Sequence, residues 1–347
     1  MSQPIVAVLY IRGGIVKLYK LNYLIMKFVS IPKNGSSWRG RLPYSFTTEG
    51  DEPQDVTVEI LNYDTGSVLG TMRLYGVVGG EVDIAPYIRP YVSMRFVETS
   101  RLAEFSTSLS AIKAMVRIGG VLSEPRVFFR SEFDSSVVGP LSDRVSNPTM
   151  IQGESIRMTI FAQVRADVAV SFVGKNGSSY KQEILTRGMP VELVVNTNSV
   201  GSIERVNINI RCDNSNIFVL SYTVMQHMGT SQRIVWYNKR GGVESYLFDH
   251  AKRLSYDVDR GGRTLCDEKR LNIDGRVRYR LCSGYEQQAD MERVAQLMLS
   301  PIVCRGCGSE CREVEVESRE ITFDDKGVLR SITLDLSEKW EGGESLW

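Results

Sequence analysis

The stretch Arg233-Ile-Val-Trp-Tyr-Asn-Lys-Arg-Gly-Gly-Val-Glu-Ser-Tyr-Leu-Phe248 has the composition of two β-strands joined by a tight turn. Aromatic and β-branched residues, which suit a pleated and half-buried surface, stand on both sides of its Lys-Arg-Gly-Gly segment. Gly241 and Gly242 can adopt the positive φ that a tight reversal requires. The stretch therefore predicts a β-hairpin, and it follows a long series of other predicted strands.

The chain before this hairpin contains two such series. Alternating apolar and polar residues in Val56-Thr-Val-Glu-Ile60 and Val92-Ser-Met-Arg-Phe-Val97 predict strands of a first β-sandwich-like domain, residues 26–141. Asp83-Ile-Ala-Pro-Tyr-Ile-Arg-Pro90 interrupts this series, because its two prolines favour a sheet edge or a short helical turn. The polar, turn-forming segment 142–148 marks a boundary, and the short strands after it predict a sandwich of immunoglobulin size, residues 142–232.

The last third, residues 233–347, is predicted to be a β-rich C-terminal domain. It contains the one clear helical pattern, about 286–299, with apolar residues at helical spacing before Ser300-Pro301. The predicted fold class is therefore all-β and multidomain, with consecutive antiparallel β-sandwich-like domains and one amphipathic helix in the C-terminal β domain. Residues 1–25 are apolar and basic and are expected to be an N-terminal arm, or an over-extended start before a true start at Met26.

Composition limits the possible functions. The 347 residues are 42% hydrophobic and 24% charged, and the formal net charge is +1, so neither a disordered chain nor a basic nucleic-acid-binding surface is indicated. No phosphate-binding glycine loop, dinucleotide fingerprint or hydrolase motif appears, and His227 and His250 stand beside no nucleophile motif. No apolar run is long enough to span a bilayer. We therefore expect a protein that is not an enzyme, needs no cofactor, binds no nucleic acid and has no membrane span.

Cysteine spacing gives a weak sign of a metal site. Cys304, Cys307 and Cys311 form a C-x2-C-x3-C run whose thiolates could bind zinc, with Cys282 or Cys266 as a fourth ligand. No second C-x-x-C completes the set, and strand-like residues flank the run, so a cysteine-rich hairpin tip is the simpler interpretation. Reduced thiols are expected for a chain that folds in the cytosol.

Three stretches together resemble a known group of proteins. They are Phe28-Val-Ser-Ile-Pro followed by Trp38-Arg-Gly-Arg-Leu-Pro-Tyr-Ser-Phe46, then Val82-Asp-Ile-Ala-Pro-Tyr-Ile88, and finally Val235 to Phe248. They are similar to virion structural proteins of phages and prophages from Bacteroides-type bacteria, in which a Trp-x-Asn-x-x-Gly-Gly-x-Glu-x-x-x-Phe pattern recurs. The matching residues here are Trp236, Asn238, Gly241, Gly242, Glu244 and Phe248. The cysteine run does not belong to that pattern.

The resemblance implies a structural component of a tail, tail tip or baseplate. Such a protein is made in the bacterial cytoplasm, joins the virion, and contacts copies of itself and other virion proteins. Self-contact is expected through the aromatic hairpin, that is Trp236, Tyr237, Asn238, Gly241, Gly242, Glu244, Tyr246 and Phe248.

Two other functions stay open at this stage. One is a carbohydrate-binding or adhesive β-sandwich that stacks exposed rings on a surface glycan, with Trp38, Tyr44, Trp236 and Tyr237 as candidates. The other is a metal-binding protein built on the cysteine run.

Overall fold

The structure is a computed structural model in which strands predominate, as predicted. It describes residues 26–48, 52–96, 99, 101–133, 139–142, 149–162, 165–175, 177–185, 188–197, 203–212, 215–226, 230–260, 273–307 and 310–340. The predicted arm, residues 1–25, lies outside the described residues. The chain divides into two compact units. The first lies within Met1–Lys33, Gly40–Arg89 and Lys113–Arg126, and the second comprises Asn34–Arg39, Pro90–Ile112 and Val127–Trp347.

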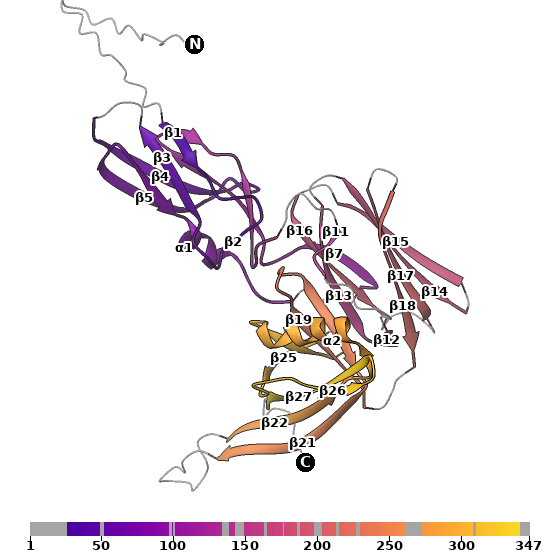
Figure 1. Ribbon diagram of the computed structural model, residues 1–347. Coiled ribbons are helices and arrows are strands. Elements are labelled where there is room, and N and C mark those ends of the chain that lie inside the picture. The colour runs from indigo at the N-terminus through magenta and orange to yellow at the C-terminus, as the bar shows by residue number, and fades with distance from the viewer. Residues whose placement is uncertain are drawn as a thin grey trace, which may run out of the picture. The chain divides into compact units, whose positions relative to one another are not determined.

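The first unit contains two groups of antiparallel strands (Figure 1). In one group β3 (Pro43–Thr48) pairs with both β1 (Met26–Ser30) and β6 (Gly79–Asp83). In the other, β4 (Gln54–Asn62) pairs with β5 (Val68–Val77) and β8 (Ile112–Ile118), and β9 (Val121–Leu122) returns beside β8. Inward side chains at alternate positions form the core, among them Tyr44, Phe46, Val58, Ile60 and Val116.

The proline-containing segment, residues 83–90, contains a short helical turn, which is one of the two forms predicted for it. It folds as α1 (Ala85–Ile88) and the 3-10 turn η1 (Arg89–Tyr91), with Pro86 in the first helical turn, where its missing N–H costs nothing. The predicted strand at Val92 is not formed, because residues 92–96 have irregular backbone. Met94 and Phe96 in this segment pack instead on the β19–β20 hairpin described below.

The second unit begins with a sandwich of two sheets (Figure 1). One sheet has the order β11-β13-β16-β7, and the other has the order β12-β18-β17-β14-β15. The strands are β7 (Ala103–Thr107), β11 (Gly139–Pro140), β12 (Thr149–Ile151), β13 (Ser155–Phe161), β14 (Ala166–Gly174), β15 (Gly177–Leu185), β16 (Pro190–Asn196), β17 (Ile203–Cys212) and β18 (Ser215–Met225). A single apolar core between the sheets includes Met158, Val170, Phe172, Leu193 and Ile208.

The boundary predicted between residues 141 and 142 does not match this sandwich. β7, from within predicted domain 26–141, pairs with β16 over Ala103 to Thr107 and forms an edge of the second unit's sheet. The two-residue strand β2 (Ser36–Ser37) likewise pairs in parallel with the end of β10 (Arg126–Phe129), at Phe128 and Phe129. Pairing between strands distant in sequence leaves no compositional sign, so the boundary could not be located from turn residues alone.

The C-terminal part of the second unit is one large antiparallel sheet in the order β20-β19-β24-β25-β27-β22-β21. Its strands are β19 (Gln232–Tyr237), β20 (Val243–Phe248), β21 (His250–Arg260), β22 (Ile273–Cys282), β23 (Glu286–Gln287), β24 (Val303–Cys307), β25 (Glu310–Val316), β26 (Thr322–Lys326) and β27 (Leu329–Trp340). β19 and β20 form the hairpin predicted from the opening stretch, with Trp236 opposite Glu244, so that prediction is confirmed.

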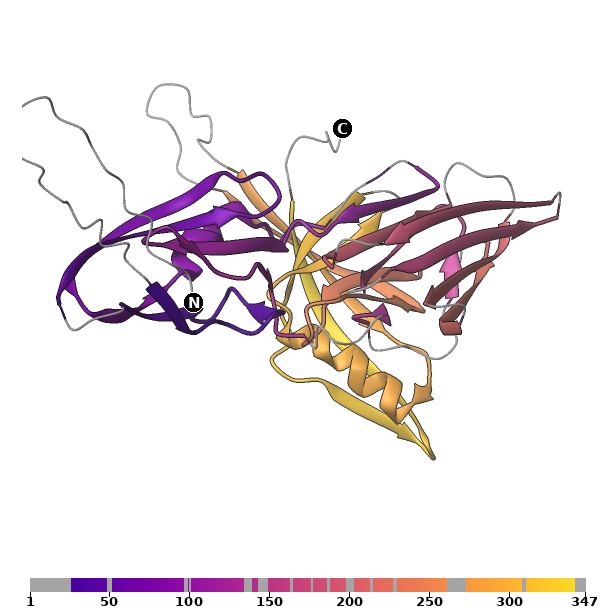
Figure 2. The same ribbon diagram turned by 90° about the horizontal axis from the view of Figure 1, so that it is seen from above.

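The helix predicted at about 286–299 is present but shorter and irregular. α2 (Gln288–Val294) continues as the 3-10 helix η2 (Ala295–Leu299), and two-residue strand β23 precedes it. Met291, Val294 and Leu297 are fully buried against the sheet beside Trp236 and Phe248. Figure 2 shows this orange helix lying along the yellow and orange strands. Its apolar stripe is therefore used for packing within the chain.

Candidate functional site

The β19–β20 hairpin is buried within its own chain. Trp236, Tyr246 and Phe248 pack on the helix side of the sheet, whereas Tyr237 and Val243 pack on the other side with Phe96. Trp236 is 1% exposed and Phe248 is fully buried. The sequence led us to expect self-contact through this hairpin. The structure buries these side chains within one chain, and self-contact through this hairpin stays a prediction.

The turn of the hairpin is held by the side chain of Asn238. Its Oδ1 accepts hydrogen bonds from the backbone N–H groups of Arg240 (2.9 Å) and Gly242 (2.8 Å). Its Nδ2 donates to the Leu141 carbonyl (2.7 Å) and to Glu244 Oε1 (2.8 Å). One buried amide therefore closes the turn and also fastens it to the chain segment next to β11.

Glu244 and the two glycines complete this contact. Ser142 Oγ donates to Glu244 Oε2 at 2.9 Å. A Cβ on Gly242 would overlap the Leu141 carbonyl, and one on Gly241, whose φ is +77°, would lie 2.8 Å from the Phe129 ring. One contact, the packing of the hairpin turn against the sandwich, therefore explains the Asn, both Gly and the Glu of the sequence pattern. We call Asn238, Gly241, Gly242, Glu244 and Leu141 the turn clamp.

The hairpin covers the outer face of the sheet that contains β13 and β16. Every residue of both strands is buried, although a strand at the surface of a sandwich normally buries only alternate residues. Met158 and Ile160 face the sandwich core. Thr159, between them in sequence, instead accepts a hydrogen bond from the Val243 N–H of β20 at 3.0 Å.

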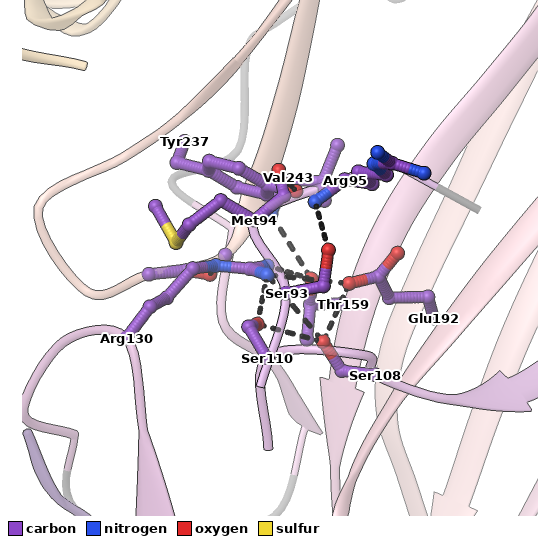
Figure 3. A network of polar contacts seen from close by, with 12 residues as sticks. Ser93, Met94, Arg95, Ser108, Ser110, Arg130, Thr159, Glu192, Tyr237 and Val243 are labelled. Atoms are coloured by element: carbon purple, nitrogen blue, oxygen red, sulfur yellow. Dashed lines mark hydrogen bonds and ion pairs between the residues drawn. The ribbon is translucent and has the colours of Figure 1, made fainter. Parts of the chain in front are cut away.

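Arg130 lies at the centre of this covered face (Figure 3). Its Nε donates to the Gly241 carbonyl, and its Nη1 donates to Ser110 Oγ, to Ser108 Oγ (3.4 Å) and to Glu192 Oε1 (3.3 Å). Its Nη2 reaches Thr159 Oγ1 at 3.4 Å. We call Arg130, Glu192, Ser108, Ser110 and Thr159 the Arg130 cluster.

Two aromatic rings complete the surroundings of Arg130. The guanidinium carbon lies 3.6 Å from the centroid of the Tyr237 ring and 4.5 Å from that of Phe129. Burial lowers the pKa of Arg130 from its usual value, whereas the nearby Tyr237 and Glu192 act to raise it. Burial also raises the pKa of Tyr237 well above its usual value, and the Tyr237 hydroxyl donates to the Met94 carbonyl at 3.0 Å. The cation is thus held by a carboxylate, by hydroxyls and by π faces.

A second buried arginine joins the hairpin to the sandwich from β19. Arg233, 2% exposed, lies 3.1 Å from Glu154 and donates to the Thr149 carbonyl (2.6 Å) and to Ser245 Oγ (3.3 Å). The two arginines and the turn clamp therefore connect the sandwich and the C-terminal sheet at three places along one hairpin.

The contacts of the Arg130 cluster hold the hairpin turn against the sandwich. Ser108 Oγ donates to Glu192 Oε1 at 2.6 Å, a pairing that an exposed site could use for catalysis. Here Ser108 and Glu192 are each 1% exposed, and their partners are other side chains of the cluster. A substrate in solution does not reach either group in this conformation.

The aromatic residues suggested for glycan stacking are buried. Trp38 is 9% exposed and donates from its indole to the Ser110 carbonyl (2.8 Å), Tyr44 is fully buried, and Trp236 and Tyr237 are 1% and 3% exposed. These four rings therefore present no stacking surface, and the expectation that they do is wrong.

The cysteines of the candidate metal site are only partly brought together. Cys304 on β24 and Cys311 on β25 share a hydrogen bond, which with burial raises the pKa of the Cys304 thiol. Cys282 lies on β22, where Thr333 donates to its sulfur at 3.6 Å. The side chains of Cys266 and Cys307 lie outside the described residues. Among the residues that the structure describes, no group of three or more His, Cys, Asp and Glu side chains could hold a metal ion.

Sequence reasoning missed Arg130, Glu192, Ser108, Ser110, Thr159 and Arg233 as members of a site. They come from segments as far apart as residues 108 and 233. The available signal was a charged residue inside an apolar strand run, as in Val191-Glu-Leu-Val-Val195. That signal is weak, because the same pattern is expected for an ordinary strand with one face in water.

Within the described part of the chain, no helix has the length and apolar character needed to cross a membrane. No family model matches the chain, and a search of curated proteins found no match. Solved structures with some similarity include the chicken interferon gamma receptor alpha chain (11% identity, 56% of this chain and 99% of that chain, TM-score 0.16) and CBD12 from CALX1.2 (11% identity, 51% and 77%, TM-score 0.16). Another is the FN1–FN3 domains of chicken CNTN1 (7% identity, 74% and 91%, TM-score 0.19). At these TM-scores the similarities carry no argument about function.

Proposed function

We propose that this protein is a non-enzymatic structural component of a phage or prophage tail, of tail, tail-tip or baseplate type. It would be made in the bacterial cytoplasm and would assemble into the virion with copies of itself and with other virion proteins. The observation that carries the proposal is the use of the Trp-x-Asn-x-x-Gly-Gly-x-Glu-x-x-x-Phe residues. Asn238, Gly241, Gly242 and Glu244 hold the hairpin turn against the sandwich. Trp236 and Phe248 pack the same hairpin on the helix of the C-terminal sheet.

This use of polar residues suits a mechanical role. Buried ion pairs contribute little net stability compared with apolar packing, but their directional hydrogen bonds fix one arrangement of the parts. Arg130 and Arg233 each bind groups from both the sandwich and the hairpin, so sliding of one part over the other breaks several bonds together. A subunit that transmits force in a tail requires such a fixed internal arrangement.

The test is the protein composition of particles from a producing bacterium. Phage particles are induced, purified through a density gradient and analysed by quantitative mass spectrometry. Peptides of this chain are expected at several copies per particle, and antibodies against it are expected to label the tail in electron micrographs. Particles that lack the chain, or labelling confined to cell debris, would contradict the proposal.

A second candidate function, glycan binding, is favoured by the outer face of the other sheet of the sandwich. Tyr180, Ser171, Asn207 and Ser221 stand opposite one another on four adjacent strands. Ser221 Oγ donates to Asn207 Oδ1 at 2.7 Å, and Tyr180 is 63% exposed. A ring beside a row of uncharged polar groups is the usual composition of a sugar-binding surface.

This second function is tested on a glycan array with the full chain. Tyr75, an exposed tyrosine of the first unit (70%), provides the control. Binding that Tyr180→Ala abolishes and that Tyr75→Ala leaves intact would support it. An array without signal for the wild-type protein would rule against this candidate and leave the tail proposal standing.

A further inference from the structure

The two edge strands of the large C-terminal sheet, β20 and β21, have different surroundings. At one end, β20 is covered by the sandwich through the Val243–Thr159 hydrogen bond and the turn clamp. At the other end, β21 pairs with β22 and with no further strand among those that the structure describes. Figure 1 shows β21 outermost beside β22. Within the described ranges, the backbone contact at its outer edge lies at the start of the strand, where the Ala251 N–H donates to the Thr230 carbonyl at 2.7 Å.

The open part of β21 combines apolar and charged side chains. Leu254, Tyr256 and Val258 are 41%, 47% and 41% exposed, and Lys252, Arg253 and Asp257 are exposed among them. A long edge strand with exposed apolar side chains is a template for pairing with another strand. The charged side chains along this edge therefore decide which partner strand can pair with β21.

A β-bulge sets which of these side chains share a face. The pairing of β21 with β22 shifts by one residue between Arg253 and Ser255, so Leu254 is the extra residue. Lys252, Ser255 and Asp257 stand opposite Arg280, Arg278 and Arg276 and so share one face. Arg253, Tyr256 and Val258 stand opposite Tyr279, Val277 and Gly275 and share the other face.

This arrangement is self-complementary. We propose that β21 pairs antiparallel with β21 of a second copy of this chain, about a two-fold axis between Leu254 and Ser255. Lys252 of one copy then lies opposite Asp257 of the other on one face, and Arg253 lies opposite Tyr256 on the other face. Both contacts occur twice, as two-fold symmetry requires. The sheets of the two copies become continuous.

The bulge is what makes this register possible. In a regular strand, a two-fold axis between two residues would place each side chain opposite one from the other face, because successive residues alternate. The extra residue at Leu254 reverses the alternation, so that Lys252 and Asp257 have the same orientation. An axis through Ser255 would bring Arg253 opposite Asp257, but these two lie on different faces.

Contacts inside one chain already show that these groups attract. Asp257 lies 2.9 Å from Arg278, with both side chains about half exposed, and Arg253 lies 5.1 Å from the Tyr256 ring centroid. In the paired form Asp257, Arg253 and Tyr256 each gain a second partner of the same kind, and Lys252 gains a carboxylate. The inference deepens the proposed function, since it names the surface through which copies of this tail protein would associate.

The test is the mass of the full-length protein by light scattering and sedimentation across a wide concentration range. The wild-type chain is expected to form a dimer. Lys252→Asp and Asp257→Lys are each expected to weaken it by about tenfold or more, because like charges then meet at both contacts. The control is Lys175→Asp, which changes the net charge as Lys252→Asp does but lies in the exposed turn between β14 and β15.

The decisive measurement is a mixture of the two weakened variants. Lys252→Asp and Asp257→Lys proteins bring opposite charges together at both contacts when combined, so the equimolar mixture is expected to dimerise although neither does alone. Circular dichroism of each variant checks its fold. A wild-type protein that stays monomeric at every concentration would overturn the pairing, and so would a dimer indifferent to Lys252→Asp. The particle analysis above then still decides the tail proposal independently.

Discussion

Arg130 Nη1 lies 3.3 Å from Glu192 Oε1, and each side chain is only 1% exposed. Arg130 directly follows β10 and Glu192 lies in β16, 62 positions later. Between them they contact the hairpin turn, β13 and the segment at Ser108. Through Arg130, this buried ion pair links the sandwich to the hairpin of the C-terminal sheet. Changing it therefore tests how the two parts are held together.

Replacing Arg130 with methionine leaves the Glu192 carboxylate buried without its cation. The free energy of unfolding is expected to fall by about 3–5 kcal/mol, whereas the double variant R130M/E192L is expected to recover most of the loss. Denaturant unfolding followed by intrinsic fluorescence measures both. R276M is the matched control, because its ion pair with Glu315 is exposed (55% and 66%) and is worth about 0–1 kcal/mol. Equal losses in R130M and R276M would contradict the assigned role.

Asn238→Asp changes one atom of the turn clamp. The new oxygen would face both the Leu141 carbonyl and the Glu244 carboxylate, where the amide now donates two hydrogen bonds. We expect a loss of about 2–4 kcal/mol at neutral pH, since a buried donor is exchanged for a charge. Adding Glu244→Gln supplies a donor and is expected to restore part of the loss. A double variant less stable than N238D would show that Glu244 does not oppose the new charge.

Gly242→Ala tests the close approach of the turn to the sandwich. Its methyl group would overlap the Leu141 carbonyl, so the variant is expected to lose about 1–3 kcal/mol as the backbone moves apart. Gly306→Ala serves as the control, because its Cβ would meet only Arg233 atoms at 3.7 Å or more, an ordinary contact. Thermal unfolding of both variants gives the comparison, and similar melting temperatures would argue against a tight approach.

The buried Tyr44 hydroxyl is expected to make the stability of the first unit depend on alkaline pH. Burial, the largest cause, raises its pKa to about 12, and the side chain is fully buried. Since the folded-state pKa exceeds the unfolded value of about 10, the stabilisation is complete below about pH 10 and is lost as pH rises through 12. The loss is about 2–3 kcal/mol for a shift of this size.

Tyr44→Phe removes this titration and keeps the ring. Hydrogen exchange at the amides of β3 and β4 is expected to accelerate between about pH 10 and 12 in the wild-type protein and less so in Y44F. Tyr75→Phe, whose ring is 70% exposed, is expected to follow the wild type. Identical profiles for Y44F and the wild type would refute the prediction.

Much of the fold was accessible from local patterns. Alternation in Val56 to Ile60 and the Gly241-Gly242 turn predicted a strand and a hairpin that the structure contains, because side-chain period and turn chemistry are properties of neighbouring residues. The helix was located but was predicted longer and more regular than it is. β7 was assigned to the wrong side of a boundary, because strand pairing over a long separation has no local sign.

The sequence by itself determined that this is an all-β chain ending in a strand-rich domain with one packed helix, since burial of alternate residues is set locally. The resemblance to the virion-protein pattern also singled out Asn238, Gly241, Gly242 and Glu244 together. Only the tertiary structure decided that this unit clamps the turn onto Leu141, and that the hairpin covers a sheet face bearing Thr159 and Glu192. On an isolated sandwich these polar side chains would face water. Burying them is tolerable because Arg130, Ser108 and the Val243 N–H, which come from other parts of the chain, form hydrogen bonds with them.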